Sequence, residues 1–285
     1  MTLQLHDIPS LRSWRAAERA AGRRVGFVPT MGALHAGHLA LVDAARAASD
    51  TVLLSVFVNP LQFGPGEDFE RYPRDLDRDL ALAAGRGVTA AFVPGVAVMY
   101  PPGSETRVVP GAMAERWEGA QRPGHFAGVL TVVTKLFNLV QPDLAVFGQK
   151  DIQQVCLVRR MVADLDLPVE LKVVPTVREP DGLALSSRNA YLSPADREAA
   201  LSLSRALRAA AGLWQAGVTD PTRLEAAMME QFRIWSGVTL DYIAIVDPAT
   251  MAPVPVAVAG TIVAVAARVG RTRLLDNHIL GTEFC

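Results

Sequence analysis

Short apolar segments alternate with longer amphipathic segments up to about residue 178. Residues 51–58 are almost continuously apolar, which is typical of a parallel strand buried on both faces. Residues 124–140 instead carry apolar side chains at helical spacing, and Pro142 follows them. Because this alternation requires right-handed crossovers, we expect an α/β protein whose parallel sheet has helices on both faces. The other expected strands are 25–28, 90–93, 144–147 and 169–174, and the other expected helices are 9–21, 37–48, 73–85 and 151–165.

The pattern changes after residue 178. The segments expected there are two long helices and two strands, at 194–217, 221–235, 242–246 and 261–269. Helices followed by strands are typical of an α+β unit. A chain of 285 residues is long enough for two domains. We therefore expect a first domain over 1–178 and a smaller α+β domain over 179–285.

Composition and charge favour a small-molecule ligand. The formal net charge of −1 lacks the basic footprint of a nucleic-acid-binding protein. The two cysteines, Cys156 and Cys285, fit neither a disulfide framework nor a metal knuckle. The first residues show no secretory signal, and the longest uncharged run, 248–267, contains three prolines and one glycine, which favours strands around a turn over a membrane span. We expect a cytoplasmic protein without a nucleic-acid or membrane partner.

A candidate phosphate site follows the first strand, where His35 and His38 stand at the beginning of a helix. The first N–H groups of a helix and the positive end of its dipole bind anions, and two imidazoles three residues apart can donate from one side. Gly32 and Gly37 allow a ligand to approach the backbone closely. The alternatives are a polar surface turn or a metal site, although no third zinc ligand is near in the sequence. Both common phosphate loops, Walker A and Gly-x-Gly-x-x-Gly, are absent from the sequence.

Further polar clusters lie at predicted strand ends and in a loop. Asn59 and Gln62 follow the second strand, where their amides can fix a small polar substrate or simply form an Asn-Pro turn. Lys150 can place a charge near phosphates, with Gln154 one turn further on, or it can belong to a solvated capping turn at Asp151. The hydroxyls and guanidinium of residues 186–188 can clamp a polyphosphate or lie in an ordinary linker.

Acidic residues alternate with arginines at the start of the helix expected at 73–85. Such a pattern usually marks a solvated helix face with its own ion pairs. One of these carboxylates can instead reach a magnesium ion on ATP. Asp79 is the candidate for that second role.

Six motifs, which occur in order over nearly the whole chain, resemble those of the pantoate–β-alanine ligase (pantothenate synthetase) family. They are Thr30–His38, Phe57–Phe63, His125–Val129, Phe147–Gln154, Val177–Asn189 and Thr272–Asn277. The resemblance implies a Rossmann-like first domain that binds ATP and pantoate, a smaller lid domain and a homodimer. It also implies a two-step reaction. The pantoate carboxylate attacks the α-phosphate of Mg–ATP to give pantoyl adenylate and pyrophosphate, and the amine of β-alanine then displaces AMP.

The resemblance also assigns roles to residues. It makes His35, His38, Lys150 and Arg188 catalytic, with His38 as the proton donor. Gln62, Gln154 and Asn59 would bind substrate, and Asp79 would bind Mg²⁺, although family members often have two acidic residues where this chain has Arg78 and Asp79. The ATP-binding set would be Thr30, Met31, Gly32, Ala33, Leu34, His35, Ala36, Gly37, His38, Gly148, Gln149, Lys150, Asp151, Val177, Leu185, Ser186, Ser187 and Arg188.

Two other function classes stay open at the level of sequence. One is a different nucleotidyltransferase of the His-x-Gly-His superfamily, which would leave AMP or CMP on its product. The other is a nucleotide sensor without turnover. A tRNA-charging fragment is disfavoured by the near-neutral charge.

Overall fold

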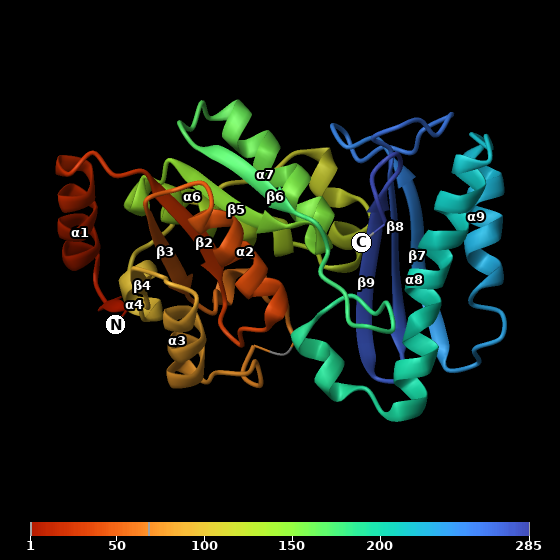
Figure 1. Cartoon of the computed structure of the whole chain (residues 1–285), viewed down its shortest axis with the longest axis horizontal. Coiled ribbons are helices and arrows are strands. Elements are labelled where there is room, and N and C mark those ends of the chain that lie inside the picture. The colour runs from red at the N-terminus through yellow and green to blue at the C-terminus, as the bar shows by residue number, and fades with distance from the viewer. Residues whose placement is uncertain (1, 68, 285) are drawn as a thin grey trace. The chain divides into compact units, whose positions relative to one another are not determined.

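The computed structural model of the protein describes residues 2–67 and 69–284, and the chain divides into two compact units (Figure 1). Unit 1 comprises Met1–Glu115, Gly119–Gly148 and Leu157–Val174, and unit 2 comprises Arg116–Glu118, Gln149–Cys156 and Pro175–Cys285. Unit 2 therefore takes two short segments from the first part of the chain. The expected domain boundary at residue 178 stays a prediction about how the chain is organised.

Unit 1 is built on a six-stranded parallel sheet, and five of its strands were expected from the sequence. The order is β1-β4-β3-β2-β5-β6. The strands are β1 (Leu3–Leu5), β2 (Val25–Thr30), β3 (Thr51–Val56), β4 (Ala90–Phe92), β5 (Leu144–Gly148) and β6 (Glu170–Val174). Strand β2 pairs with β3, the next strand in sequence, on one side and with β5 on the other side. The strand order thus switches between β2 and β5, and in such sheets ligands bind beyond the carboxyl ends of the strands at that point.

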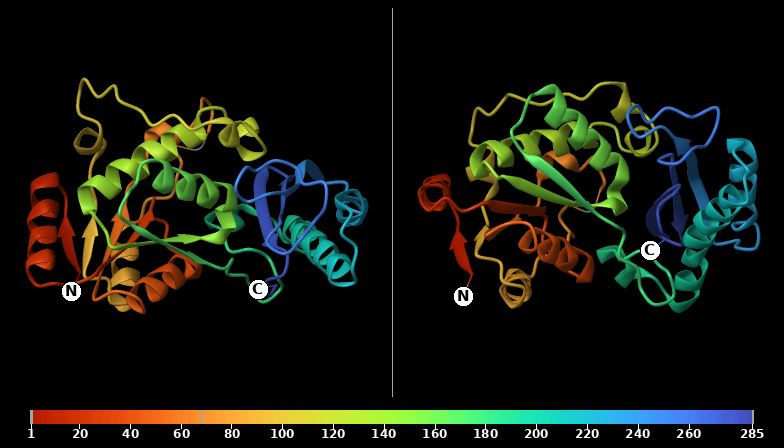
Figure 2. Two further views of the ribbon diagram at one scale, coloured as in Figure 1. Left: turned by 90° about the horizontal axis from the view of Figure 1, so that it is seen from above. Right: turned by 45° about the horizontal axis from the view of Figure 1, so that its top comes forward.

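Helices cover both faces of this sheet (Figure 2). Val28 of β2 packs in one core cluster with Val42 of the helix that follows it. The preceding residue of β2, Phe27, points the other way, and its ring lies 6.4 Å from that of Phe137. The helices of unit 1 are α1 (Ile8–Ala20), α2 (Ala36–Arg46), α3 (Leu76–Gly85), α4 (Val96–Met99) and α6 (His125–Val140), while α5 (Glu118–Gln121) and α7 (Ile152–Asp164) contain residues of both units. The α/β class is therefore confirmed.

Unit 2 packs two helices against a three-stranded antiparallel sheet of order β7-β8-β9 (Figure 1). Its elements are α8 (Pro194–Gln215), α9 (Pro221–Glu230), β7 (Val238–Val246), β8 (Ile262–Val269) and β9 (Thr272–Ile279). Leu203 and Leu207 of α8, Leu224 of α9 and Val263 of β8 are all buried in one core. The α+β character expected for this part of the chain is confirmed.

Several element boundaries differ from the sequence expectation. Helix α3 begins at Leu76 rather than at residue 73, because Asp75 accepts the backbone N–H of Arg78 at 3.2 Å and caps the helix. Helix α9 ends at Glu230 rather than at residue 235. The apolar periodicity nevertheless continues to Trp235, since the turns after α9 still pack on the same core. Strands β1 and β9 were absent from the expected set.

Candidate active site

The loop between β2 and α2 has a backbone that only a few residue types can adopt. Gly32 has φ = 87° and Ala33 has φ = 52°, so two successive residues occupy the left-handed region. A Cβ at Gly32 would lie 2.9 Å from a carboxylate oxygen of Asp79 and 3.1 Å from the Val56 side chain. Glycine is therefore required there by both conformation and space. The turn carries the chain from the carboxyl end of β2 at Thr30 to the first residues of α2.

Asp79 of α3 holds this loop in place. Its side chain is only 1 % exposed, and its two oxygens accept the backbone N–H groups of Ala33 and Leu34, each at 2.7 Å. The neighbouring Arg78 donates to the carbonyl of Leu34 at 3.3 Å. This carboxylate thus already satisfies two backbone donors of the turn. The magnesium role expected for Asp79 stays a prediction, and the described residues contain no group of three or more His, Cys, Asp or Glu side chains that could hold a metal ion.

His35 and His38 form a capping box at the N-terminus of α2. The Nδ1 atom of His35 accepts the backbone N–H of Gly37 at 3.1 Å, and Nδ1 of His38 accepts the backbone N–H of His35 at 3.4 Å. Because each Nδ1 acts as an acceptor, the ring proton of each neutral imidazole lies on Nε2. The ring centroids are 4.1 Å apart. The N-terminus of α2 therefore carries two neighbouring N–H donors at the positive end of the helix dipole, which suits an anion.

Asn59 and Gln62 belong to the 3₁₀ turn Pro60–Gln62 and its cap, which begins three residues after the end of β3. Asn59 is buried, and its Nδ2 donates to the Gln62 Oε1 at 3.1 Å. Gln62 is half-buried, and its Nε2 lies 3.0 Å from the sulfur of Met31 in the β2–α2 loop. The structure therefore brings Gln62 and Met31 together in unit 1. The substrate-binding roles of Asn59 and Gln62 stay predictions.

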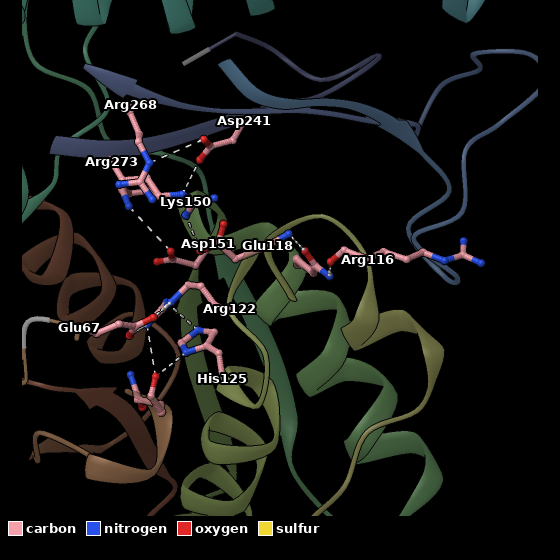
Figure 3. A network of polar contacts seen from close by, with 12 residues as sticks. Glu67, Arg116, Glu118, Arg122, His125, Lys150, Asp151, Asp241, Arg268 and Arg273 are labelled. Carbon is pink, nitrogen blue, oxygen red and sulfur yellow. Dashed lines mark hydrogen bonds and ion pairs between the residues drawn. The ribbon is translucent and has the colours of Figure 1, made fainter. Parts of the chain in front are cut away.

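Glu67, Arg122 and His125 form a charged cluster whose role was not predicted from the sequence (Figure 3). The cluster contacts the backbone carbonyl of Gln62. Arg122 makes a bidentate ion pair with the two carboxylate oxygens of Glu67, at 2.8 and 2.6 Å. His125 Nδ1 lies 2.8 Å from the Gln62 carbonyl, which can only accept, so Nδ1 carries the proton and Nε2 faces an Arg122 N–H at 3.1 Å. Burial raises the pKa of Glu67, but Arg122 outweighs that effect and holds the pKa below its ordinary value. The Arg-Pro-Gly-His sequence at residues 122–125 was the signal for this cluster.

In unit 2, Asn277 of β9 fixes the short turn that contains Gln149, Lys150 and Asp151. Its Nδ2 donates to the carbonyls of Gln149 and Lys150, both at 2.9 Å. Next to it, Asp276 forms a buried pair with Arg178 at 2.6 and 3.0 Å, and burial raises the pKa of Asp276. Lys150 Nζ lies 3.8 Å from the carboxylate of Asp151. Side-chain hydrogen bonds from Asn277 thus hold the turn that contains Lys150. Gln154 lies half-buried in the first turn of α7, which follows it.

The segment of Ser186, Ser187 and Arg188 is also held within unit 2. Ser186 caps a 3₁₀ turn by accepting the Arg188 backbone N–H at 3.2 Å. Asn189 donates to Glu179 at 2.9 Å and to the Ala184 carbonyl at 3.0 Å. Arg197 binds Glu179 and thereby lowers the pKa of that carboxyl. The backbone of Leu185 donates to Val177 at 2.9 Å, so Val177 and Leu185 lie side by side at the base of the loop.

A third polar cluster of unit 2 joins the segment 116–118 to the small sheet (Figure 3). Arg273 of β9 binds Glu118 at 2.7 Å and Asp241 of β7 at 2.6 Å. Gln153 accepts the Glu118 backbone N–H at 3.0 Å and donates to the Arg116 carbonyl at 2.9 Å. These contacts explain why residues 116–118 belong to unit 2 although they lie far from it in sequence.

The expected site residues therefore divide between the units. Unit 1 contains Thr30, Met31, Gly32, Ala33, Leu34, His35, Ala36, Gly37, His38, Asn59, Gln62, Asp79 and Gly148, and unit 2 contains Gln149, Lys150, Asp151, Gln154, Val177, Leu185, Ser186, Ser187 and Arg188. Among the described residues, no helix is both long enough and apolar enough to span a membrane.

Comparison with known proteins identifies the family. The family model described as pantoate–β-alanine ligase matches residues 4–279. A pantothenate synthetase of Moorella thermoacetica is 52% identical over 276 residues, which are 97% of this chain and 98% of that protein. The crystal structure of pantothenate synthetase from Thermus thermophilus has a TM-score of 0.92 at 52% identity, with 98% of this chain and 99% of that chain covered. A pantoate–β-alanine ligase from Francisella tularensis, crystallised with β,γ-ATP and β-alanine, has a TM-score of 0.81 at 33% identity, with both chains covered completely (100%). The chain belongs to the pantoate–β-alanine ligase family, and it is an enzyme of the ligase class.

Proposed function

We propose that this enzyme condenses pantoate with β-alanine to form pantothenate, driven by the conversion of ATP to AMP and pyrophosphate. The observation that carries the proposal is the pair of imidazoles that caps α2, in a chain of this family. Their Nε2 donors and the helix N-terminus suit the α-phosphate region of ATP, where negative charge develops. The Francisella ligase, crystallised with β,γ-ATP and β-alanine, supports the choice of these two substrates.

The first step is adenylation. A carboxylate oxygen of pantoate attacks the α-phosphorus of ATP, the new O–P bond forms, and the bond to the β-phosphate oxygen breaks. Pyrophosphate leaves with that electron pair, and pantoyl adenylate stays on the enzyme. A free carboxylate is a poor acylating agent, so the step supplies the leaving group that amide formation needs. His38 would donate a hydrogen bond or proton to the departing oxygen, and His35 would contact the phosphates.

The second step forms the amide. The neutral amine of β-alanine attacks the acyl carbon of pantoyl adenylate, the C–N bond forms, and the C–O bond to AMP breaks. AMP leaves with the electron pair, and the amide nitrogen releases its extra proton to solvent. Neither step forms a bond to a protein side chain. The enzyme contributes positioning and charge stabilisation.

The remaining expected residues take binding roles in this proposal. Lys150, Ser186, Ser187 and Arg188 would hold the triphosphate with charged and hydroxyl donors. The loop 30–34 and residues 148–151, 177 and 185 would line the nucleotide site. Gln62 and Gln154 would orient pantoate. The homodimer implied by the family stays a prediction.

Magnesium enters this proposal as the Mg–ATP complex. ATP phosphates supply most ligands of such an ion, usually with one or two carboxylates. Each oxygen of Asp79 already accepts one backbone N–H group, which uses part of the acceptor capacity of this carboxylate, and its magnesium role stays a prediction. In this proposal the ion arrives with the substrate, as Mg–ATP.

Product analysis tests the proposal. The enzyme is supplied with ATP, magnesium, pantoate and β-alanine, and the products are separated by chromatography. We expect AMP, pyrophosphate and pantothenate in equal amounts, with none formed when pantoate is omitted. ADP and inorganic phosphate would contradict adenylation. A stable nucleotidylated product would identify a different nucleotidyltransferase, and ATP binding without turnover would identify a sensor.

Two histidine variants test whether His38 takes part in the reaction. His38→Ala removes the imidazole proposed to act on the phosphates, and we expect a loss of at least about a hundredfold in kcat. The variant should stay folded with a modestly lower melting temperature, because His38 is half-buried in the first turn of α2 and its loss removes one capping contact. His6→Ala removes an exposed histidine from the same unit and is expected to keep full activity.

A further inference from the structure

The orientation of the Gln62 side-chain amide in unit 1 is determined by backbone groups. The backbone N–H of Leu61 lies 3.3 Å from Asn59 Oδ1, and an N–H must meet an oxygen. The backbone carbonyl of Gly128 lies 3.1 Å from Asn59 Nδ2, and a carbonyl must meet a donor. These two contacts assign the oxygen and nitrogen of Asn59 without ambiguity, although amide orientations are not visible directly.

Asn59 passes this orientation on to Gln62. The second N–H of Asn59 Nδ2 donates to Gln62 Oε1 at 3.1 Å. The oxygen of the Gln62 amide is therefore turned towards Asn59, and its Nε2 lies at the other end, 3.0 Å from the sulfur of Met31. Sulfur is a weak acceptor, so a ligand oxygen can readily replace it. Gln62 thus presents N–H donors, and its acceptor atom is already engaged.

Tyr100 holds Asn59 from the opposite side. Its hydroxyl donates to Asn59 Oδ1 at 2.9 Å. The ring is fixed by Phe57, with 6.1 Å between ring centroids, and by the Lys135 ammonium, 5.6 Å from the ring centre. Burial raises the pKa of Tyr100 to about 12, so the hydroxyl keeps its proton and stays a donor at neutral pH.

The amide of Asn59 has no capacity left for a substrate. It is 1 % exposed, its oxygen accepts from Leu61 and Tyr100, and its nitrogen donates to Gln62 and Gly128. Its contribution to the reaction must therefore pass through a neighbour, and Gln62 is the neighbour that is only half-buried.

We propose that Tyr100 and Asn59 are positioning residues that act through Gln62, holding its amide so that Nε2 donates to an oxygen of pantoate. The inference rests on the proposed function and adds a rule of specificity to it. A fixed donor favours a carboxylate or hydroxyl oxygen and disfavours a donor group. The ammonium group of β-alanine therefore cannot occupy the place next to Gln62 Nε2.

Steady-state kinetics with a double-mutant cycle test whether Tyr100 acts through Gln62. Tyr100→Phe removes only the hydroxyl, and we expect the KM for pantoate to rise about three- to tenfold, the usual effect of one lost hydrogen bond. The KM for ATP should not change. Gln62→Ala should raise the KM for pantoate further. In the Gln62→Ala background Tyr100→Phe should have no additional effect, because the group through which it acts is gone.

A control and a polarity-reversing variant complete the experiment. Tyr242→Phe removes the hydroxyl of another half-buried tyrosine, in unit 2, and should leave the KM for pantoate unchanged. Asn59→Asp replaces the Nδ2 donor with a second oxygen acceptor. The Gln62 amide must then rotate so that its Nε2, rather than its Oε1, faces residue 59. We expect this variant to raise the KM for pantoate by at least about tenfold. Melting temperatures of all variants identify any that fail to fold.

Two results would contradict the proposal that Tyr100 and Asn59 act through Gln62. In one, the effects of Tyr100→Phe and Gln62→Ala multiply in the double variant. In the other, Tyr100→Phe and Tyr242→Phe have the same KM for pantoate. Either result in an enzyme that makes pantothenate contradicts only this inference. A wild-type enzyme that makes no pantothenate contradicts the proposed function as well.

Discussion

The carboxylate of Asp79 accepts the backbone N–H of Leu34 at 2.7 Å, across 45 positions of sequence. Its other oxygen does the same for Ala33, so one buried side chain holds a left-handed turn at the end of β2. Strained turns of this kind persist only where their surroundings enforce them. The position of His35 and His38 at the start of α2 therefore depends on a residue of α3.

Replacing Asp79 tests this dependence. Asp79→Ala leaves two backbone N–H groups without their acceptors, and we expect a loss of about 2–4 kcal/mol in the free energy of unfolding. Asp79→Asn keeps one acceptor and should lose about half as much. Both variants should raise the KM for ATP, because the loop loses its shape. Denaturant titration and steady-state kinetics measure the two effects.

The same variants distinguish a loop-holding role from a magnesium-binding one. If Asp79 holds only the loop, the magnesium concentration that gives half-maximal rate at fixed ATP should not change in Asp79→Asn. A marked increase in that concentration would instead support the magnesium role. Asp77→Asn serves as the control, since Asp77 is exposed in the first turn of the same helix.

Gly128 allows α6 to lie against the turn that carries Gln62. A Cβ at this position would lie 2.1 Å from the carbonyl oxygen of Leu61, which is backbone and cannot move aside cheaply. Gly128→Ala is expected to cost about 2 kcal/mol or more of stability, and to raise the KM for pantoate by displacing Gln62. Gly212→Ala, in an exposed position of α8 with nothing within 4 Å of the new Cβ, should instead gain up to about 1 kcal/mol. Equal effects of the two substitutions on unfolding would contradict this account.

Arg188 should contribute binding of the triphosphate. Arg188→Ala removes a charged donor of the Ser186 turn, and we expect the KM for ATP to rise by about tenfold or more. The KM for pantoate should change less. Arg205→Ala removes an exposed arginine from α8 of the same unit and is the matched control. Unchanged ATP kinetics in Arg188→Ala would remove this residue from the ATP site.

Unit 2 should lose stability in mild acid because of His278. Burial is the main cause that lowers the pKa of His278 to about 4 from the ordinary 6.5, with Arg178 and Arg208 adding to it. The unfolded chain therefore binds more protons than the folded one between these values, so stability is present above pH 6.5 and is lost as the pH falls towards 4. We expect a loss of about 1 kcal/mol between pH 7 and pH 5.

Tryptophan fluorescence during urea unfolding can measure that loss. Trp117, Trp214 and Trp235 lie in unit 2, whereas Trp14 lies in unit 1, so the emission reports mainly on unit 2. His278→Gln should flatten the dependence of unfolding free energy on pH over this range. His6→Gln, which replaces an exposed histidine of unit 1, should leave the dependence as it is in the wild type. A slope that persists in His278→Gln assigns the effect to another group.

Local patterns predicted the parallel sheet and the place of the histidine pair. The apolar run of β3 and the turn before His35 are recognisable from a few neighbouring residues. Strand β9 was missed because its residues include Asp276, Asn277 and His278, which would normally be exposed. They are buried here because Arg178, 98 positions away, pairs with Asp276, and because Asn277 binds a turn 127 positions away.

The supporting side chains of the site were beyond prediction for the same reason. The sequence indicated Asp79 as a solvated residue or a metal ligand, because its backbone partners lie in another element. Tyr100 lies outside every helix and strand expected from the sequence, and its bond to Asn59 spans 41 positions. Spacing within an element predicts which residues share a face, whereas contacts between distant elements depend on the complete fold.

Isotope exchange measures the central claim most directly. The enzyme is incubated with ATP, magnesium, pantoate and labelled pyrophosphate, without β-alanine. If the pantoate carboxylate attacks the α-phosphate before the amine takes part, label should enter ATP, and the exchange should require pantoate and disappear in His38→Ala. Exchange that needs β-alanine, or that proceeds without pantoate, would contradict the adenylate mechanism.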